Sequence, residues 1–188
     1  MKTVATALIM AAGLAFSAHA QDSLPGQSLI ASPAIDHWAL GGNSNHRMIH
    51  ETGVPGGWAL NVKLAGAGAN PWDVQAGVAT TRAIHKGDVV LLAFWARTAA
   101  PPPGDTSAHI IADIQQGHAP YARIGDATLN VSGTWKLYYV SGTSQLDLQP
   151  GEAAATVQLA TAEQEIELGP VFLRDFGQGY DPAKLPVN

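Results

Sequence analysis

Apolar and polar residues alternate along most of the chain from residue 58 onward. Leu60, Val62 and Leu64 occupy every second position of ALNVKL, and the same spacing recurs in HIIADIQQ. A period of two places the apolar side chains on one face of an extended strand. The pattern therefore predicts strands at ALNVKL, DVVLLAFWART, HIIADIQQ, WKLYYVSG, ATVQLAT and EIELGPVFLRDF.

Stretches rich in glycine and proline separate these segments and predict turns, for example at GAGANPWD, QQGHAPY and QPGEAAA. No window after the first twenty residues has helical spacing with caps at both ends, so we expect almost no helix. The order of strands and turns predicts an all-β fold, an antiparallel β-sandwich of seven or eight strands. Residues 41–57 are rich in Gly, Asn and His, and we expect them to be irregular.

The N-terminus has the features of a secretory signal. Lys2 precedes an apolar run from Val4 to Phe16, and Ala18-His19-Ala20 has the small-x-small form that signal peptidases cleave. We therefore expect a signal peptide at residues 1–20, a single domain at 21–188, and export to the periplasm or the medium. Later apolar runs are all shorter than the roughly 20 residues of a membrane-spanning helix, so no membrane span is expected.

Composition restricts the partners. The chain has no cysteine, so it forms no disulfide and carries no lipid-modified cysteine. Its formal net charge is -5 and only 13% of its residues are charged, which argues against nucleic acid as a partner. A surface rich in small polar side chains suits neutral, hydroxylated ligands.

Motifs for catalysis are not evident. The sequence has no G-x-S-x-G, and without cysteine no thiol nucleophile is available. Glycoside hydrolysis needs a pair of carboxylates, but Asp73, Asp113 and Glu165 have no spacing that selects a pair. We interpret these three as solvated residues at strand ends and expect no enzymatic activity.

A histidine pair gives a weak metal signal. His46 and His50 would share one face of a helix, as zinc ligands do, but the glycines and the proline around them are incompatible with a helix. We interpret them as surface histidines and expect no metal site.

The aromatic residues are more informative. Sugars stack on Trp and Tyr rings and bond to planar side chains with several donors, such as Gln, Asn and Arg. In PWDVQ, Trp72 is followed three residues later by Gln75, and Trp72 is either a sugar platform or a core residue. Arg97 in FWART is expected to point away from the core if Phe94 points into it. Gln115 and Tyr121, around the turn QQGHAPY, are candidates for a groove wall.

Between residues 57 and 176 the sequence resembles the family 4/9 carbohydrate-binding modules, which have a galactose-binding-like jelly-roll fold. The resemblance rests on GGWALNVKL, on PWDVQAGVATTRAIHKGDVVLLAFWARTA and on GTWKLYYVSGT. It implies non-catalytic binding of a polysaccharide or oligosaccharide in a cleft on one concave sheet face, often as an accessory to glycoside hydrolases. By position it implies that Trp72 and Gln75 are the cleft aromatic and its polar neighbour. Arg97, Gln115 and Tyr121 are further candidates for the cleft.

The sequence departs from the family at its structural calcium site. Family members often bind calcium through an Asp-Asp pair near the C-terminus, whereas this chain has Gly169-Pro170 there, which argues against a bound calcium. The sequence also leaves open two other functions. These are a small jelly-roll hydrolase or polysaccharide lyase, and a structural or interaction domain of the cell envelope.

Overall fold

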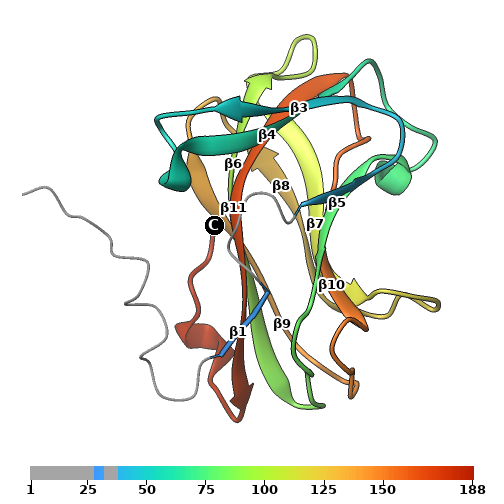
Figure 1. Ribbon diagram of the computed structural model, residues 1–188, viewed down its shortest axis with the longest axis vertical. Helices are drawn as coiled ribbons and strands as arrows, with labels where there is room; N and C mark the ends of the chain where they lie inside the picture. Colours follow the sequence, from blue (N-terminus) through green and yellow to red (C-terminus); the bar gives the residue numbers. More distant parts are fainter. Residues whose placement is uncertain (1–27, 32–37) are drawn as a thin grey trace, which may run out of the picture.

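The computed structural model describes residues 28–31 and 38–188. Two antiparallel sheets pack face to face, and the described residues contain short 3-10 turns but no α-helix (Figure 1). The antiparallel β-sandwich expected from the sequence is confirmed, although the described residues form eleven strands and not the seven or eight expected. The expected signal peptide, residues 1–20, lies outside the described residues. In the part of the chain that is described, no helix is long and apolar enough to cross a membrane.

The first sheet has six strands. Their spatial order is β3 (Asn45–His50), β4 (Trp58–Leu64), β11 (Gln164–Gln178), β6 (Asp88–Ala100) and β9 (Lys136–Thr143), with β1 (Ser28–Ala31) also paired to β11. β11 is long enough to pair with β4 near its start and with β1 nearer its end, while β6 lies along its other side.

The second sheet has five strands. Their spatial order is β2 (Ala39–Gly41), β5 (Gln75–Ala79), β10 (Ala153–Gln158), β7 (Ala108–Gln116) and β8 (Arg123–Val131). One short turn, η3 (Pro71–Asp73), leads into β5, and the 3-10 turns η2 (Pro55–Gly57) and η4 (Pro182–Lys184) lie elsewhere in the chain.

The core lies between the two sheets and is built from the alternating apolar residues. Phe94 is fully buried, with the ring of Tyr138 stacked on it and the ring of Trp38 packed edge-on. In the five-stranded sheet, Ala155 and Val157 of β10 face the core. Thr156 and Gln158 alternate with them and therefore face outward, which places polar side chains on the outer face of that sheet.

Some strands do not follow from the alternation. The six segments with clear spacing correspond to β4, β6, β7, β9, β10 and β11. Residues 41–57 were expected to be irregular, but they contain β3. β3 lies at the edge of its sheet and most of its side chains are exposed, so it has almost no apolar alternation.

Candidate binding groove

The outer face of the five-stranded sheet is hollowed. The main hollow has a volume of about 410 Å³ and is lined by Trp72, Gln75, Gln115, Tyr121, Arg123 and Gln158. A second hollow of about 390 Å³ shares Gln75, Gln115 and Tyr121 with the first and extends toward the sheet edge over Ala39, Gly77 and Thr156. We call the two together the groove. Its lining residues come from all five strands of the sheet.

Strand register explains why these residues meet. Gln75 of β5 lies opposite Gln158 of β10, and Gln115 of β7 lies opposite Arg123 of β8. All four face away from the core, because their neighbours along each strand face into it. Gly77, which has no side chain, and Ala154, which has only a methyl group, also line the groove and occupy little of its space.

Trp72 is held on a closely constrained turn. Trp72 is 53% exposed, which excludes the alternative that it is a core residue. The turn is capped by Asp73, whose carboxylate accepts from the Asn70 backbone N–H at 2.9 Å. The carbonyl of Pro71 accepts from the Ala160 N–H at 3.0 Å, which ties the turn to the sheet.

Gly42 at the end of β2 lies directly against this turn. Its φ is +90°, and a Cβ added there would lie 1.9 Å from the carbonyl oxygen of Asp73. Only glycine allows the chain to pass so close with this backbone conformation. The position of the Trp72 ring therefore depends on residues distant in sequence.

Tyr121 borders the same hollow from the turn between β7 and β8. It is 56% exposed, and its φ of +58° is unusual for a residue with a side chain. The turn is closed by hydrogen bonds from the Tyr121 N–H to the His118 carbonyl at 2.8 Å and from the Gln116 N–H to the Ala122 carbonyl at 2.9 Å. Backbone strain of this kind is often kept at functional sites.

A buried polar network lies beneath the groove. Asp113 of β7 is fully buried and accepts hydrogen bonds from the Thr156 hydroxyl and, at 2.7 Å, from Gln158 Nε2. Burial raises the pKa of Asp113, against the opposing effect of the Thr156 hydrogen bond. The expectation that Asp113 is a solvated strand end is wrong, because it lies in mid-strand under its neighbours.

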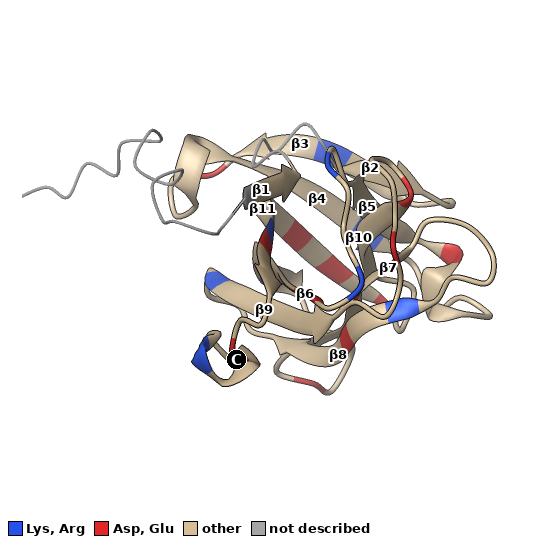
Figure 2. Cartoon of the chain, turned by 90° about the horizontal axis from the view of Figure 1, so that it is seen from below, with Lys and Arg blue, Asp and Glu red and all other residues tan. Residues whose placement is uncertain are grey.

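The groove carries little unbalanced charge. Of the six side chains that line the main hollow, Arg123 is the one cation, and its Nη1 lies 3.1 Å from Asp126 Oδ2. Lysines and arginines are scattered along the described part of the chain (Figure 2). The lining can therefore stack on rings and bond hydroxyls, but it offers little to attract a polyanion.

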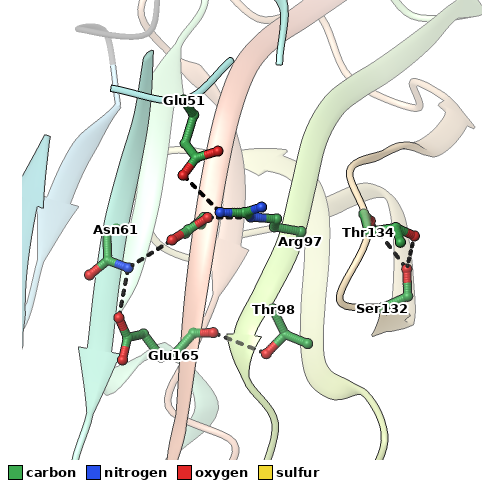
Figure 3. A network of polar contacts seen from close by, with 8 residues as sticks. Glu51, Asn61, Arg97, Thr98, Ser132, Thr134 and Glu165 are labelled. Atoms are coloured by element: carbon green, nitrogen blue, oxygen red, sulfur yellow. Dashed lines mark hydrogen bonds and ion pairs between the residues drawn. The ribbon is translucent and has the colours of Figure 1, made fainter. Parts of the chain in front are cut away.

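Arg97 does not lie in the groove, and its expected position there is wrong. It belongs to β6 of the other sheet, where it is paired with Glu167 and donates to Glu51 at 2.8 Å (Figure 3). Its guanidinium also lies 5.2 Å from the centre of the Trp135 ring. Burial alone would lower the pKa of Arg97, but the hydrogen bonds and charges of the two glutamates raise it above its ordinary value. Arg97 does point away from the core, as expected, but on the wrong sheet.

The structure brings the other four predicted residues together. Trp72, Gln75, Gln115 and Tyr121 line one hollow. Sequence reasoning missed Gln158 and Arg123. Gln158 is a polar residue inside the apolar strand ATVQLAT, and its outward position in that strand is the one signal that could have identified it.

No metal site is found in the described part of the chain, where no group of three or more His, Asp or Glu side chains could hold an ion. At the position of the family's Asp-Asp pair, the carbonyl of Gly169 accepts a hydrogen bond from Trp38 Nε1 at 2.8 Å, inside the core. A Cβ at Gly169 would meet Val54 and Trp95 within 3 Å. These residues do not fit a calcium ion.

Solved structures share this architecture. A family 4 carbohydrate-binding module is 20% identical with a TM-score of 0.57, over 73% of this chain and 94% of that one. The second N-terminal cellulose-binding domain of Cellulomonas fimi β-1,4-glucanase C is 22% identical with a TM-score of 0.55, over 84% of this chain and 94% of that one. A xylan-binding CBM22-1 domain from Paenibacillus barcinonensis Xyn10C is 12% identical with a TM-score of 0.55, over 81% of this chain and 94% of that one.

The chain has the jelly-roll fold of the carbohydrate-binding modules. No protein-family model matches the sequence, and no curated protein matches it significantly. The fold resemblance expected from the sequence is thus confirmed, while these identities are too low to transfer a ligand.

Proposed function

We propose that this protein is an exported, non-catalytic carbohydrate-binding protein that holds a neutral polysaccharide or oligosaccharide in the groove, as an accessory to a separate glycoside hydrolase. The observation that carries the proposal is that two exposed aromatic rings, Trp72 and Tyr121, border one hollow that is also lined by amide side chains. The fold shared with cellulose- and xylan-binding domains supports the same ligand class.

The chemistry of the lining fits a sugar chain. Aromatic faces stack on the C–H faces of pyranose rings, and Gln75 and Gln115 each offer both a donor and an acceptor to hydroxyls. Each such hydrogen bond contributes about 1 kcal/mol net, so we expect affinities of about 10 μM to 1 mM. A groove across the sheet favours a single soluble chain over a flat crystalline surface.

Binding without catalysis is part of the proposal. Of the carboxylates next to the groove, Asp113 is sealed beneath it, Asp126 is paired with Arg123, and Asp73 accepts the hydrogen bond that caps the Trp72 turn. A general acid must reach the glycosidic oxygen of its substrate, and Asp113 has no exposed surface from which to do so.

Affinity electrophoresis of the secreted form in gels containing hydroxyethylcellulose, xylan or a β-1,3-glucan tests the proposal. At least one glycan should retard the wild type, and Trp72→Ala should migrate as it does without glycan. Trp58→Ala is the matched control, because Trp58 is similarly exposed at 46% but belongs to the other sheet. Retardation of Trp72→Ala equal to that of the wild type, or the release of new reducing ends, would overturn the proposal.

A further inference from the structure

One buried acceptor beside the groove has no hydrogen-bond partner. Gln158 lines the main hollow and is only 3% exposed. Its Nε2 donates to Asp113 Oδ2 at 2.7 Å, whereas its Oε1 is buried and accepts from no described residue. Buried amide oxygens are nearly always satisfied in folded proteins, so an oxygen of this kind next to a hollow points to a ligand donor.

The orientation of this amide is fixed by Asp113. Both carboxyl oxygens of Asp113 accept hydrogen bonds, one from the Thr156 hydroxyl and the other from Gln158 Nε2, so the N–H₂ side of the amide faces Asp113. A flipped amide would set two oxygens against each other. Asp113 is itself held by the Thr156 hydroxyl, its direct neighbour in the sheet register. Gln158 therefore has its oxygen, and not its nitrogen, left for a ligand.

We propose that Gln158 Oε1 accepts a hydrogen bond from a hydroxyl of the bound glycan, and that Asp113 is the positioning residue that fixes this acceptor. The inference rests on the proposed glycan binding and makes it more specific. Oε1 is covered in the free protein, so a ligand reaches it when a neighbouring side chain moves aside. Gln75, opposite Gln158 in the register, is one flexible neighbour that also lines the hollow.

The acceptor Gln158 Oε1 also restricts the class of ligand that the groove can bind. A fixed acceptor takes an O–H donor and rejects groups that present only lone pairs, namely the carboxylate of a uronic acid and the oxygen of an O-methyl or O-acetyl group. The groove should therefore select a neutral glycan with a free hydroxyl at this point and discriminate against the same chain when it is substituted there.

Titration calorimetry with cellohexaose and xylohexaose tests the inference on a set of variants. For the hexasaccharide that binds, Gln158→Met keeps the length of the side chain but removes the acceptor, and it should weaken binding about fivefold or more. Asp113→Leu should weaken binding to a similar extent. Asp113→Asn should stay within threefold of the wild type, because its amide oxygen still accepts from Gln158 Nε2 while its nitrogen donates to Thr156. The double variant Asp113→Leu/Gln158→Met should bind no more weakly than Gln158→Met alone.

A matched control separates binding from stability. Gln164 is also a buried glutamine, at 2% exposed, but its Nε2 donates to the backbone carbonyls of His109 and Leu159, and it does not line the groove. Gln164→Met should lower the melting temperature and leave the affinity unchanged.

The outcomes separate this inference from the proposed function. If Trp72→Ala binds as well as the wild type, or if no glycan binds the wild type, the proposed function fails. If Trp72→Ala loses binding but Gln158→Met stays within twofold of the wild type, only the acceptor role is wrong. If Asp113→Leu weakens binding further in the Gln158→Met background, Asp113 does not act through Gln158, and its positioning role is overturned.

Discussion

Trp72 and Tyr121 border the same hollow from two turns that are far apart in the sequence, one before β5 and the other between β7 and β8. Both rings are more than half exposed, although large aromatic side chains usually bury most of their surface. Each ring is also held by a constrained backbone: Trp72 by the capped turn against Gly42, and Tyr121 by a left-handed φ. The backbone that carries each ring is thus constrained before a ligand arrives, which lowers the entropy cost of ordering these turns on binding.

Substitutions of Tyr121 should separate affinity from stability. Tyr121→Ala removes the ring but keeps the strained φ of +58°, whereas Tyr121→Gly removes the ring and relieves the strain. Both should weaken glycan binding equally, while the glycine variant should be more stable than the alanine variant by about 1 kcal/mol. Calorimetry and urea unfolding measure the two effects. Equal stabilities of the two variants would show that the backbone at Tyr121 is not strained. A glycan affinity like that of the wild type would show that the Tyr121 ring does not contact the ligand.

Gly42→Ala should disturb the Trp72 turn from a distance. The added Cβ would meet the Asp73 carbonyl, so the turn must shift, and both stability and glycan affinity should fall. Gly56→Ala is the control: Gly56 also has a positive φ, of +82°, but nothing lies within 4 Å of its added Cβ. It should cost about 1 kcal/mol of stability and leave affinity unchanged. If both variants bind glycan as the wild type does, the turn is not fixed by Gly42.

Arg97 and Arg123, which both lie beside carboxylates, should give opposite phenotypes. Arg97→Ala leaves Glu51 and the nearly buried Glu167 without their cation, and should lower the free energy of unfolding by about 1–3 kcal/mol with no change in affinity. Arg123→Ala breaks an exposed pair and should cost less than about 1 kcal/mol, but it should weaken glycan binding. Denaturant unfolding and calorimetry on both variants check this. A loss of glycan affinity in Arg97→Ala would contradict the prediction and indicate that Arg97 takes part in binding.

The buried carboxylate of Asp113 should make stability depend on pH. Burial raises the pKa of Asp113 in the folded state above its value in the unfolded chain. The folded protein therefore binds more protons between the two values, and the stability that Asp113 contributes decreases as pH rises from about 4 through the raised pKa. Asp113→Asn cannot ionise, so its melting temperature relative to the wild type should increase from pH 4 to pH 7. A difference that stays constant over this range would contradict the raised pKa.

The strands with a clear apolar alternation could be predicted from the sequence, because they cross the core and bury one face. β3 could not be predicted in this way, because it is an edge strand with mostly exposed residues and shows little alternation of apolar and polar residues. β2 has only three residues, too few to show a period. Local sequence therefore identifies the buried strands better than the edges of a sheet.

The candidate site could be predicted only where chemistry and local spacing coincide. Trp72 and Gln75 are three residues apart at one loop-to-strand junction, so the sequence was sufficient to associate them. Arg97 has the right chemistry and points away from the core, but the alternation does not say to which sheet its strand belongs. Gln158 and Asp113 meet through the register of β10 with β7, which the sequence alone does not encode locally.

The central claim is that the outer face of the five-stranded sheet binds the glycan. The most direct measurement is a titration of the isotope-labelled protein with the bound oligosaccharide, followed by NMR chemical shifts of the indole N–H and side-chain amide groups. The largest shifts should fall on the indole of Trp72 and the amides of Gln75, Gln115 and Gln158. Shifts centred on the indole of Trp58 or around Arg97, with the groove signals unchanged, would contradict the claim.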